Sequence, residues 1–306
     1  MLMENEERIN LFKIGEEEFA LILYSLLNRI PILISGSSKH NVEFFANKLA
    51  DLMVFRNKLI FYTDFVGKDE LNLILEEEES NYDVQRSIII CPNEGLHKAM
   101  QLFDDFKAWI LCFNSNNEDD QDVQLKVILK TILDKIQTFL YISNDNETIR
   151  VEMKSLTEFE TDLRFEKMIY RKAIKFVDDS ISKMGRIFSQ NLKKSTNYDA
   201  ELMEELLDFS FEESNLKKNF FKIQILQFYN ANRRAFSLLN KLDLLNSLNL
   251  AFNLNKQTLM ETISYTDASS TRLLEFIKQE WNADFSNYID KNKAKYKDDL
   301  VESLWG

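Results

Sequence analysis

Glycine and proline are scarce in this chain, which has only 6 Gly and 2 Pro among its 306 residues. Sandwiches and barrels need turn-forming residues at every short connection, so this composition argues against them and favours helices. Few glycines also leave few backbone segments that can wrap tightly around a phosphate group. The hydrophobic content of 45% is nevertheless high enough to fill the cores of two domains of ordinary size.

Cysteine is scarce as well, and long apolar runs are missing. Cys91 and Cys112 each lie inside a short apolar run typical of a strand, so we expect both to be buried, reduced thiols in an intracellular protein. No stretch reaches the roughly 18 apolar residues of a membrane span, and residues 1 to 10 lack the apolar segment of a secretion signal. The sequence therefore predicts a cytoplasmic protein without membrane insertion.

Positive charge is in the minority, because 38 Lys and Arg stand against 50 Asp and Glu and give a formal net charge of -12. A surface of this sign repels the phosphates of nucleic acids and of anionic lipids, so we expect neither as a partner. A protein partner with a basic face is favoured instead.

Apolar runs of strand length alternate with amphipathic segments in the first half of the chain. Strands are predicted at residues 31 to 35, 58 to 65, 86 to 92, 108 to 114 and 138 to 145. Helices are predicted between them, one of them at residues 96 to 106, and the charge run from Glu118 to Asp122 is expected in a loop. Strands separated by about a dozen helical residues form parallel crossover units. After a tail at residues 1 to 14, we therefore expect an α/β domain at residues 15 to 155, with a mostly parallel sheet and flanking helices.

From residue 156 onward the periodicity becomes helical. Apolar residues recur at three- and four-residue spacing over residues 156 to 192, 200 to 211, 216 to 253, 256 to 264 and 270 to 304. Residues 193 to 199 read as a loop, and no strand-like run of comparable length intervenes. The sequence therefore predicts an all-helical domain at residues 156 to 306.

The turn after the first predicted strand has the layout of a phosphate-binding loop. In residues 29 to 45, RIPILISGSSKHNVEFF, an apolar run ends at Gly36, a polar turn follows, and a helix begins. A nucleotide-binding P-loop needs a second Gly, a Lys and a Ser or Thr, and these positions are occupied by Asn41, Val42 and Glu43. We therefore expect no hydrolysis of ATP or GTP. In the simpler interpretation Gly36 permits the turn and Asn41 caps the helix.

Polar residues at the ends of the predicted strands form the second set of candidates. The carboxyl ends of parallel strands meet at one edge of a sheet, where ligands bind in open α/β folds, although loop-forming preference explains the same residues without a ligand. No Cys, Asp or Glu accompanies either histidine at metal-ligand spacing, and no nucleophile motif is present, so we expect no metal, no cofactor and no catalytic residue. The candidate binding residues at this edge are Gly36, Ser37, Ser38, His40, Asp64, Asn93 and Asn114.

The predicted helical domain adds Arg233, Arg234 and Trp281 to the candidates. Arginine and tryptophan are enriched in binding hot spots, so these residues are candidates for a partner-binding face. The alternative interpretation places aromatic residues at helical spacing in the core.

The order of elements in residues 16 to 117 resembles the central core of DENN domains. The helix FALILYSLLN leads directly into RIPILISG, a helix ending in LADLMVF follows, and the strand KLIFYTDF comes next. The segment RSIIICPNEGLHKAMQLFDDFKAWILCFNSNN matches the strand, short helix and strand that continue this core, and the α/β-then-helical order is similar too. The resemblance implies a non-catalytic regulatory module that binds a small GTPase, as guanine-nucleotide exchange factor or as scaffold. The residues leave one alternative open, a degenerate P-loop NTPase-like protein that lacks the phosphate-binding Lys and binds nucleotide weakly or not at all.

Overall fold

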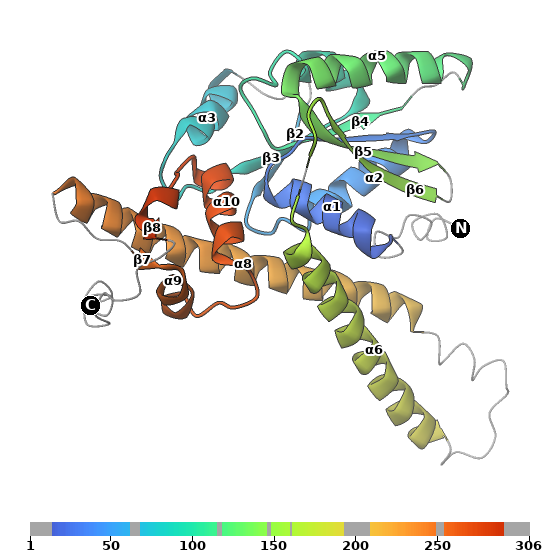
Figure 1. Ribbon diagram of the computed structural model, residues 1–306. Helices are drawn as coiled ribbons and strands as arrows, with labels where there is room; N and C mark the ends of the chain where they lie inside the picture. The colour runs from blue at the N-terminus through green and yellow to red at the C-terminus, as the bar shows by residue number, and fades with distance from the viewer. Residues whose placement is uncertain are drawn as a thin grey trace.

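A six-stranded sheet forms the centre of the computed structural model, which describes residues 14–61, 68–114, 118–145, 148–159, 161–192, 209–248 and 254–290 (Figure 1). The strand order is β2-β3-β4-β1-β5-β6; the first five strands along the chain run parallel, and β6 pairs antiparallel with β5. The expected mostly parallel sheet is therefore confirmed. The bounds are β1 Ile32–Gly36, β2 Asn57–Ile60, β3 Ser87–Cys91, β4 Trp109–Phe113, β5 Thr138–Asp145 and β6 Thr148–Ser155.

Helices cover both faces of this sheet, because strands β1, β3 and β4 are buried at every residue and need apolar partners on both sides. One face packs against α1 (Glu16–Leu27) and α2 (Lys39–Ala50). The other face packs against α3 (Lys68–Glu79), α4 (Leu96–Ala99) and α5 (Glu118–Ile136). Each face therefore has its own hydrophobic core.

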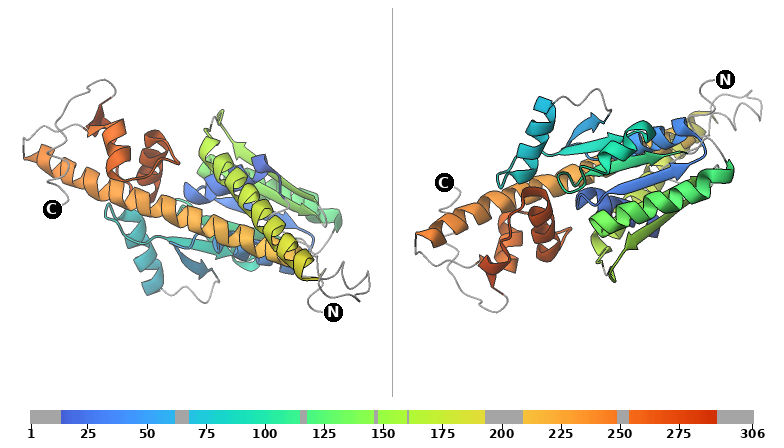
Figure 2. Two further views of the ribbon diagram at one scale, coloured as in Figure 1. Left: turned by 90° about the horizontal axis from the view of Figure 1, so that it is seen from below. Right: turned by 90° about the horizontal axis from the view of Figure 1, so that it is seen from above.

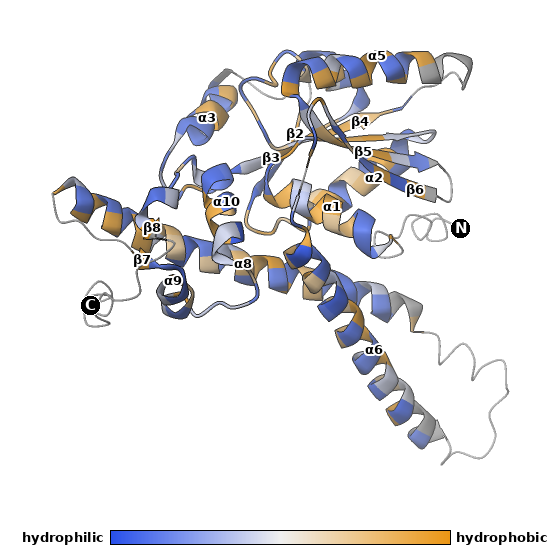
Figure 3. Ribbon diagram, viewed as in Figure 1, coloured by the Kyte–Doolittle hydropathy of each residue, from blue (hydrophilic) through white to orange (hydrophobic). Residues whose placement is uncertain are grey.

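The second half of the chain is largely helical, as expected. Its elements are α6 (Arg164–Leu192), α8 (Ser210–Ser247), α9 (Lys256–Thr262), α10 (Ser270–Trp281), a 3-10 turn at Ser286–Tyr288, and the short paired strands β7 (Leu254–Asn255) and β8 (Ile289–Asp290). The long α8 passes below the sheet, and α6 extends away from it (Figures 1 and 2). Apolar residues are concentrated in the sheet and alternate with polar ones along α6 (Figure 3).

The helical half shares its core with the α1 and α2 face of the sheet. Side chains from both halves form one continuous apolar cluster. Within it, the ring of Phe55, next to β2, stacks on Tyr229 of α8 with centroids 4.1 Å apart, and Phe19 of α1 stacks on Phe221 at 4.4 Å. The change of character at residue 156 therefore marks a change of secondary structure inside one packed unit.

Several local predictions differ from the structure. The helix predicted at residues 270 to 304 ends at Trp281, because Asn282 adopts a left-handed φ of 53° and stops it. The strands β7 and β8 lie in the half predicted to be all-helical. The helix predicted at residues 96 to 106 is confined to the four residues of α4, whereas the run from Glu118, predicted as a loop, forms the first turn of α5. The loop predicted at residues 193 to 199 lies outside the described residues.

Both cysteines are free and buried, as expected. Burial raises the pKa of Cys91 to about 12 and also raises the pKa of Cys112. Over the ranges given above, no helix is long and apolar enough to cross a membrane.

Candidate functional site

The carboxyl edge of the sheet has a topological switch point beside β1. From β1 the chain passes through α2 on one face to β2, whereas from β4 it passes through α5 on the opposite face to β5. The connections after β1 and β4 therefore diverge, and ligands of open α/β sheets bind in such crevices. The predicted site residues at this edge are Gly36, Ser37, Ser38, His40, Asn93 and Asn114.

The turn between β1 and α2 is only two residues long, Ser37 and Ser38. The N-cap of α2 is Ser38, whose Oγ accepts a hydrogen bond from the N–H of Asn41 at 3.4 Å, so the predicted cap at Asn41 is wrong. The cap lies three residues earlier because the strand leads almost directly into the helix.

Gly36 is held tightly against its neighbours. A Cβ at this position would lie 2.7 Å from the carbonyl oxygen of Asn144 and 2.9 Å from Cγ2 of Val42. Only glycine therefore fits between the end of β5 and the first turns of α2. Any larger side chain here would require β5 or the side chain of Val42 to move.

Polar contacts span the crevice beyond this turn. Lys39, the first residue of α2, donates from Nζ to Oε1 of Glu94 at 2.5 Å, and its Nζ lies 3.8 Å from Oε1 of Glu43. Glu94 follows β3, so this ion pair passes over the end of β4, which lies between β3 and β1. Below it, Oδ1 of Asn93 accepts the backbone N–H of Asn114 at 3.2 Å. The cation at the start of α2 is thus engaged by carboxylates, and the hydrogen bond from Lys39 lowers the pKa of Glu94.

The remaining candidates at this edge form no catalytic or metal-binding group. His40 is exposed on α2, and its ring stacks on Phe44 with centroids 6.1 Å apart. Among the described residues, no three His, Cys, Asp or Glu side chains gather where they would hold a metal ion. Asp64, the candidate after β2, lies outside the described residues.

The candidates of the helical half do not join the switch point. Nε of Arg233 pairs with Oδ2 of Asp83 at 2.7 Å, and the guanidinium of Arg234 donates to the carbonyl of Ile263 at 2.8 and 3.1 Å. Trp281 has no exposed surface and packs against Phe236 with ring centroids 4.8 Å apart. Trp281 thus follows the core interpretation, because a fully buried ring does not reach a partner.

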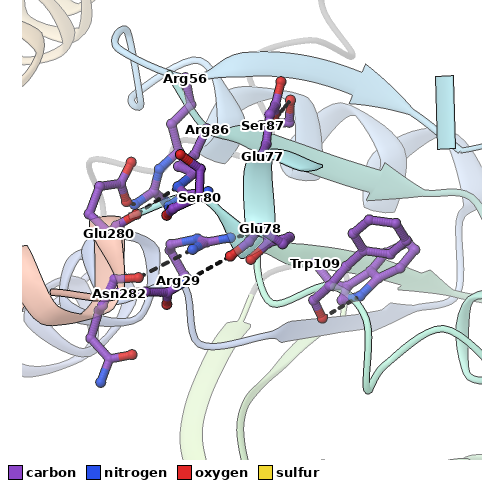
Figure 4. Close-up of polar contacts among 12 residues, drawn as sticks. Arg29, Arg56, Glu77, Glu78, Ser80, Arg86, Ser87, Trp109, Glu280 and Asn282 are labelled. Atoms are coloured by element: carbon purple, nitrogen blue, oxygen red, sulfur yellow. Dashed lines mark hydrogen bonds and ion pairs between the residues drawn. The ribbon is translucent and has the colours of Figure 1, made fainter. Parts of the chain in front are cut away.

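At the opposite edge of the sheet lies a cluster that the sequence analysis did not identify. Arg29, Arg56 and Arg86 precede β1, β2 and β3, and all three turn toward the C-terminal end of α10 (Figure 4). Arg56 donates to the Glu280 carboxylate at 2.5 Å, Arg86 donates through Nε to the Glu280 carbonyl at 2.7 Å, and Arg29 donates to the carbonyl of residue 279 at 3.2 Å. We call these three arginines and Glu280 the basal arginine cluster.

The basal arginine cluster also contacts the C-terminal ends of helices. Arg56 also donates to the last carbonyls of α1, Leu26 at 2.6 Å and Leu27 at 3.1 Å, and the guanidinium of Arg29 pairs with Glu78 of α3. Cations are stabilised at helix C-termini by the unpaired carbonyl groups there. Burial lowers the pKa of Arg29 to about 9, with Glu280 opposing and Arg56 adding to the shift. The cluster therefore binds α1, α3 and α10 to the amino edge of the sheet.

A sequence signal for this cluster exists. Each arginine stands one to three residues before a parallel strand, in RIPILI, RNKLI and RSIII, and the strands after Arg29 and Arg86 are buried at every residue. A charged residue that is buried at the amino edge of a sheet needs a polar partner inside the protein. This signal could have identified the three arginines. It could not have identified Glu280, which lies 194 to 251 positions further along the chain.

No protein-family model, no curated protein and no solved structure gives a significant match to this chain.

Proposed function

We propose that this chain is a non-catalytic regulatory module that works by binding another protein, and that the partner is a small GTPase, as the resemblance to DENN domains implies. The observation that carries the non-catalytic part is the closed two-residue turn after β1. The choice of a small GTPase rests on the resemblance of residues 16 to 117.

The closed turn argues against a bound triphosphate. A P-loop presents successive backbone N–H groups to the phosphates, a Lys to their outer oxygens and a hydroxyl to magnesium. Here the hydroxyl of Ser38 is used as the helix cap, Lys39 lies between Glu43 and Glu94, and a Cβ on Gly36 would collide with Asn144 and Val42. A polyphosphate at this place would have to compete with two carboxylates for the lysine.

Other routes to catalysis lack support in the described residues. Cys91 and Cys112 are buried, and their raised pKa values keep both as thiols rather than nucleophilic thiolates at neutral pH. A chain with a net charge of -12 and such a site is better suited to binding a partner with a basic face, with an association rate that falls as salt increases.

A binding and exchange assay tests this function. The chain is immobilised and exposed to a panel of purified small GTPases, each in GDP-loaded, GTP-loaded and nucleotide-free form. We expect saturable binding of at least one GTPase, with tighter binding to the nucleotide-free form if the chain is an exchange factor and faster release of fluorescent GDP in solution. Binding without faster release identifies a scaffold, and a panel with no binding contradicts the GTPase proposal.

A degenerate nucleotide-binding protein is the second candidate. It is favoured by the position of β1 at the switch point and by Lys39 at the amino end of α2, where anions are stabilised. Thermal unfolding with and without magnesium ATP or GTP separates the two. A nucleotide at a hundred times its dissociation constant adds about 2.7 kcal/mol, which is a rise of roughly 5 °C in Tm. Unchanged Tm values favour the interaction module.

A further inference from the structure

Strand β2 is an open edge of the six-stranded sheet. It ends the strand order, and no other strand of the described ranges pairs with its outer side. The right-hand view of Figure 2 places β2 at the margin of the sheet. The N–H groups of Asn57 and Phe61 donate toward β3, at 3.1 and 2.7 Å, so by alternation the N–H and C=O groups of Lys58 and Ile60 point outward. These outward groups are ready to pair with another strand.

Helix α8 runs beside this edge. Phe55, two residues before β2, stacks on Tyr229, and Asp83, four residues before β3, pairs with Arg233. Residues 222, 226, 229 and 233 are three or four positions apart, so they share one stripe of α8, and that stripe faces the segments around β2. Leu226 on this stripe therefore lies near the residues that lead into β2.

Exposed apolar side chains lie where α8 meets the residues around β2. Val54 is 42% exposed, Ile60 44% and Leu226 41%, and none of the described helices covers β2 on this side in the way that α2 covers β1 and β4. The side chains of Ile60 and Lys58 lie on the side of the sheet that faces α8, because Leu59 between them packs into the core of the opposite face. Within the part of the chain that the structure describes, this surface is therefore apolar and exposed, and it lies beside an unpaired strand edge.

Two lysines of α8 give this surface a positive rim. Lys218 and Lys222 have no ion-pair partner among the described side chains, whereas the nearby Lys58 pairs with Asp51 at 2.9 Å. The charges of Lys218, Asp51 and Lys58 all act on Lys222, so three amino groups and one carboxylate lie in one neighbourhood, with positive charge in excess. In a chain with a net charge of -12, this is a local patch of the opposite sign. We call the surface made by Val54, Lys58, Ile60, Lys218, Lys222 and Leu226 the α8–β2 face.

A second copy of this chain does not suit the α8–β2 face. A two-fold dimer through this face would bury both copies of its positive rim in one interface, where their like charges repel. The open backbone groups, the apolar side chains and the positive rim together fit a strand that carries both apolar and acidic residues on the face it turns toward α8. We propose that the α8–β2 face binds an extended, acidic segment of a partner protein, which adds to β2 as a further strand.

Two synthetic peptides of about seven residues probe this face. Both have Ser at every second position, and the positions between carry Val and Glu in the acidic peptide and Val and Lys in the basic peptide, so that the apolar and charged residues share one face of the strand. Fluorescence anisotropy with the full chain measures their binding. We expect the acidic peptide to bind and the basic peptide not to bind. The Lys218→Glu and Lys222→Glu double variant should weaken acidic-peptide binding by roughly tenfold or more. Ile60→Pro should weaken it as well, because an edge strand tolerates proline but loses the outward N–H donor.

A matched control separates local from overall charge. Lys126 and Lys130 lie on α5 at the same four-residue spacing, and replacing both with Glu changes the net charge equally on another face. This control should bind the acidic peptide as the original chain does, apart from a small loss of long-range attraction. Amide hydrogen exchange adds a residue-level measurement. On peptide binding, exchange should slow at Lys58 and Ile60 but not at Leu59, whose N–H already points to β3.

Several results would overturn the proposal: equal binding of the two peptides, an equal loss in the α5 control, or unchanged exchange at Lys58 and Ile60. Dimerisation of the chain through this face, seen by ultracentrifugation, would replace the acidic segment with a second copy. The proposal rests on the interaction role above but not on the partner being a GTPase. If no GTPase binds and the acidic peptide does, only the GTPase assignment fails; if a GTPase binds and the lysine variant is unchanged toward both ligands, only the α8–β2 face fails.

Discussion

Replacing Glu280 with Gln tests how strongly the basal arginine cluster holds the two halves of the chain together. The side chain is buried, and its Oε2 accepts a 2.5 Å hydrogen bond from Arg56. Gln keeps the size and one acceptor but removes the negative charge, which leaves three buried guanidinium groups with less compensation. Breaking a buried ion pair costs about 3 to 5 kcal/mol. In the variant, Arg56 retains its hydrogen bonds to the carbonyls of Leu26 and Leu27, and Arg86 retains its bond to the backbone of residue 280. We therefore expect the free energy of unfolding to fall by about 3 kcal/mol, the lower end of this range.

Urea unfolding at pH 7, followed by circular dichroism, measures this loss as a lower midpoint at an unchanged slope. Glu213→Gln is the matched control, because Glu213 is 45% exposed and pairs with Lys217 on the same helix at 2.5 Å. A pair whose carboxylate is exposed, as here, contributes about 0.5 kcal/mol and is weakened by added salt, whereas the buried pair should respond little to salt. A loss for Glu280→Gln no larger than that of the control would refute the role given to the basal arginine cluster.

Three further predictions concern the turn, the acid stability and the thiols. Gly36→Ala should destabilise the chain by roughly 1 to 3 kcal/mol in urea unfolding, because the new Cβ would lie within 3.0 Å of neighbouring atoms. Gly185→Ala, inside α6, should stabilise the chain by about 0.5 to 1 kcal/mol, because the nearest atom to its new Cβ would be 4.0 Å away. Similar effects at both sites would contradict this reasoning. Hydrogen bonds from an adjacent guanidinium lower the pKa of Asp162 to about 2, so its contribution to stability is complete above about pH 4 and is lost as the pH falls toward 2. Asp162→Asn should therefore flatten the acid limb of a plot of Tm against pH, and an unchanged limb would count against the pairing. Cys91 and Cys112 should react with a thiol reagent at pH 8 only after unfolding, and fast labelling of the folded chain would show that they are accessible.

The layers of the fold could be predicted from the sequence, because a strand that is buried on both faces has a continuous apolar sequence. Strands β1, β3 and β4 are short continuous apolar runs, and helical periodicity marks the segments that cover them. The ends of elements were harder to predict, since they depend on local geometry. The helix that ends at Trp281 does so through the left-handed backbone of Asn282, although apolar spacing continues further along the chain.

The candidate site could be predicted only in part. Gly36, Asn93 and Asn114 come together because the carboxyl ends of parallel strands share an edge, and that follows from the pattern alone. The length of the turn after β1 and the Lys39–Glu94 pair depend on where α2 begins and on the strand order. The basal arginine cluster depends on contacts across more than 190 residues, such as that of Arg86 with residue 280, which no local pattern encodes.

Isothermal titration calorimetry of the full chain with magnesium GTP and magnesium ATP tests the central claim most directly, namely that the turn after β1 does not seat a triphosphate. We predict no saturable heat for either nucleotide up to about 1 mM, the concentration at which a site worth about 4 kcal/mol would be half filled. Saturable binding that is lost when Lys39 is replaced with Ala would place a nucleotide at the start of α2 and contradict the account.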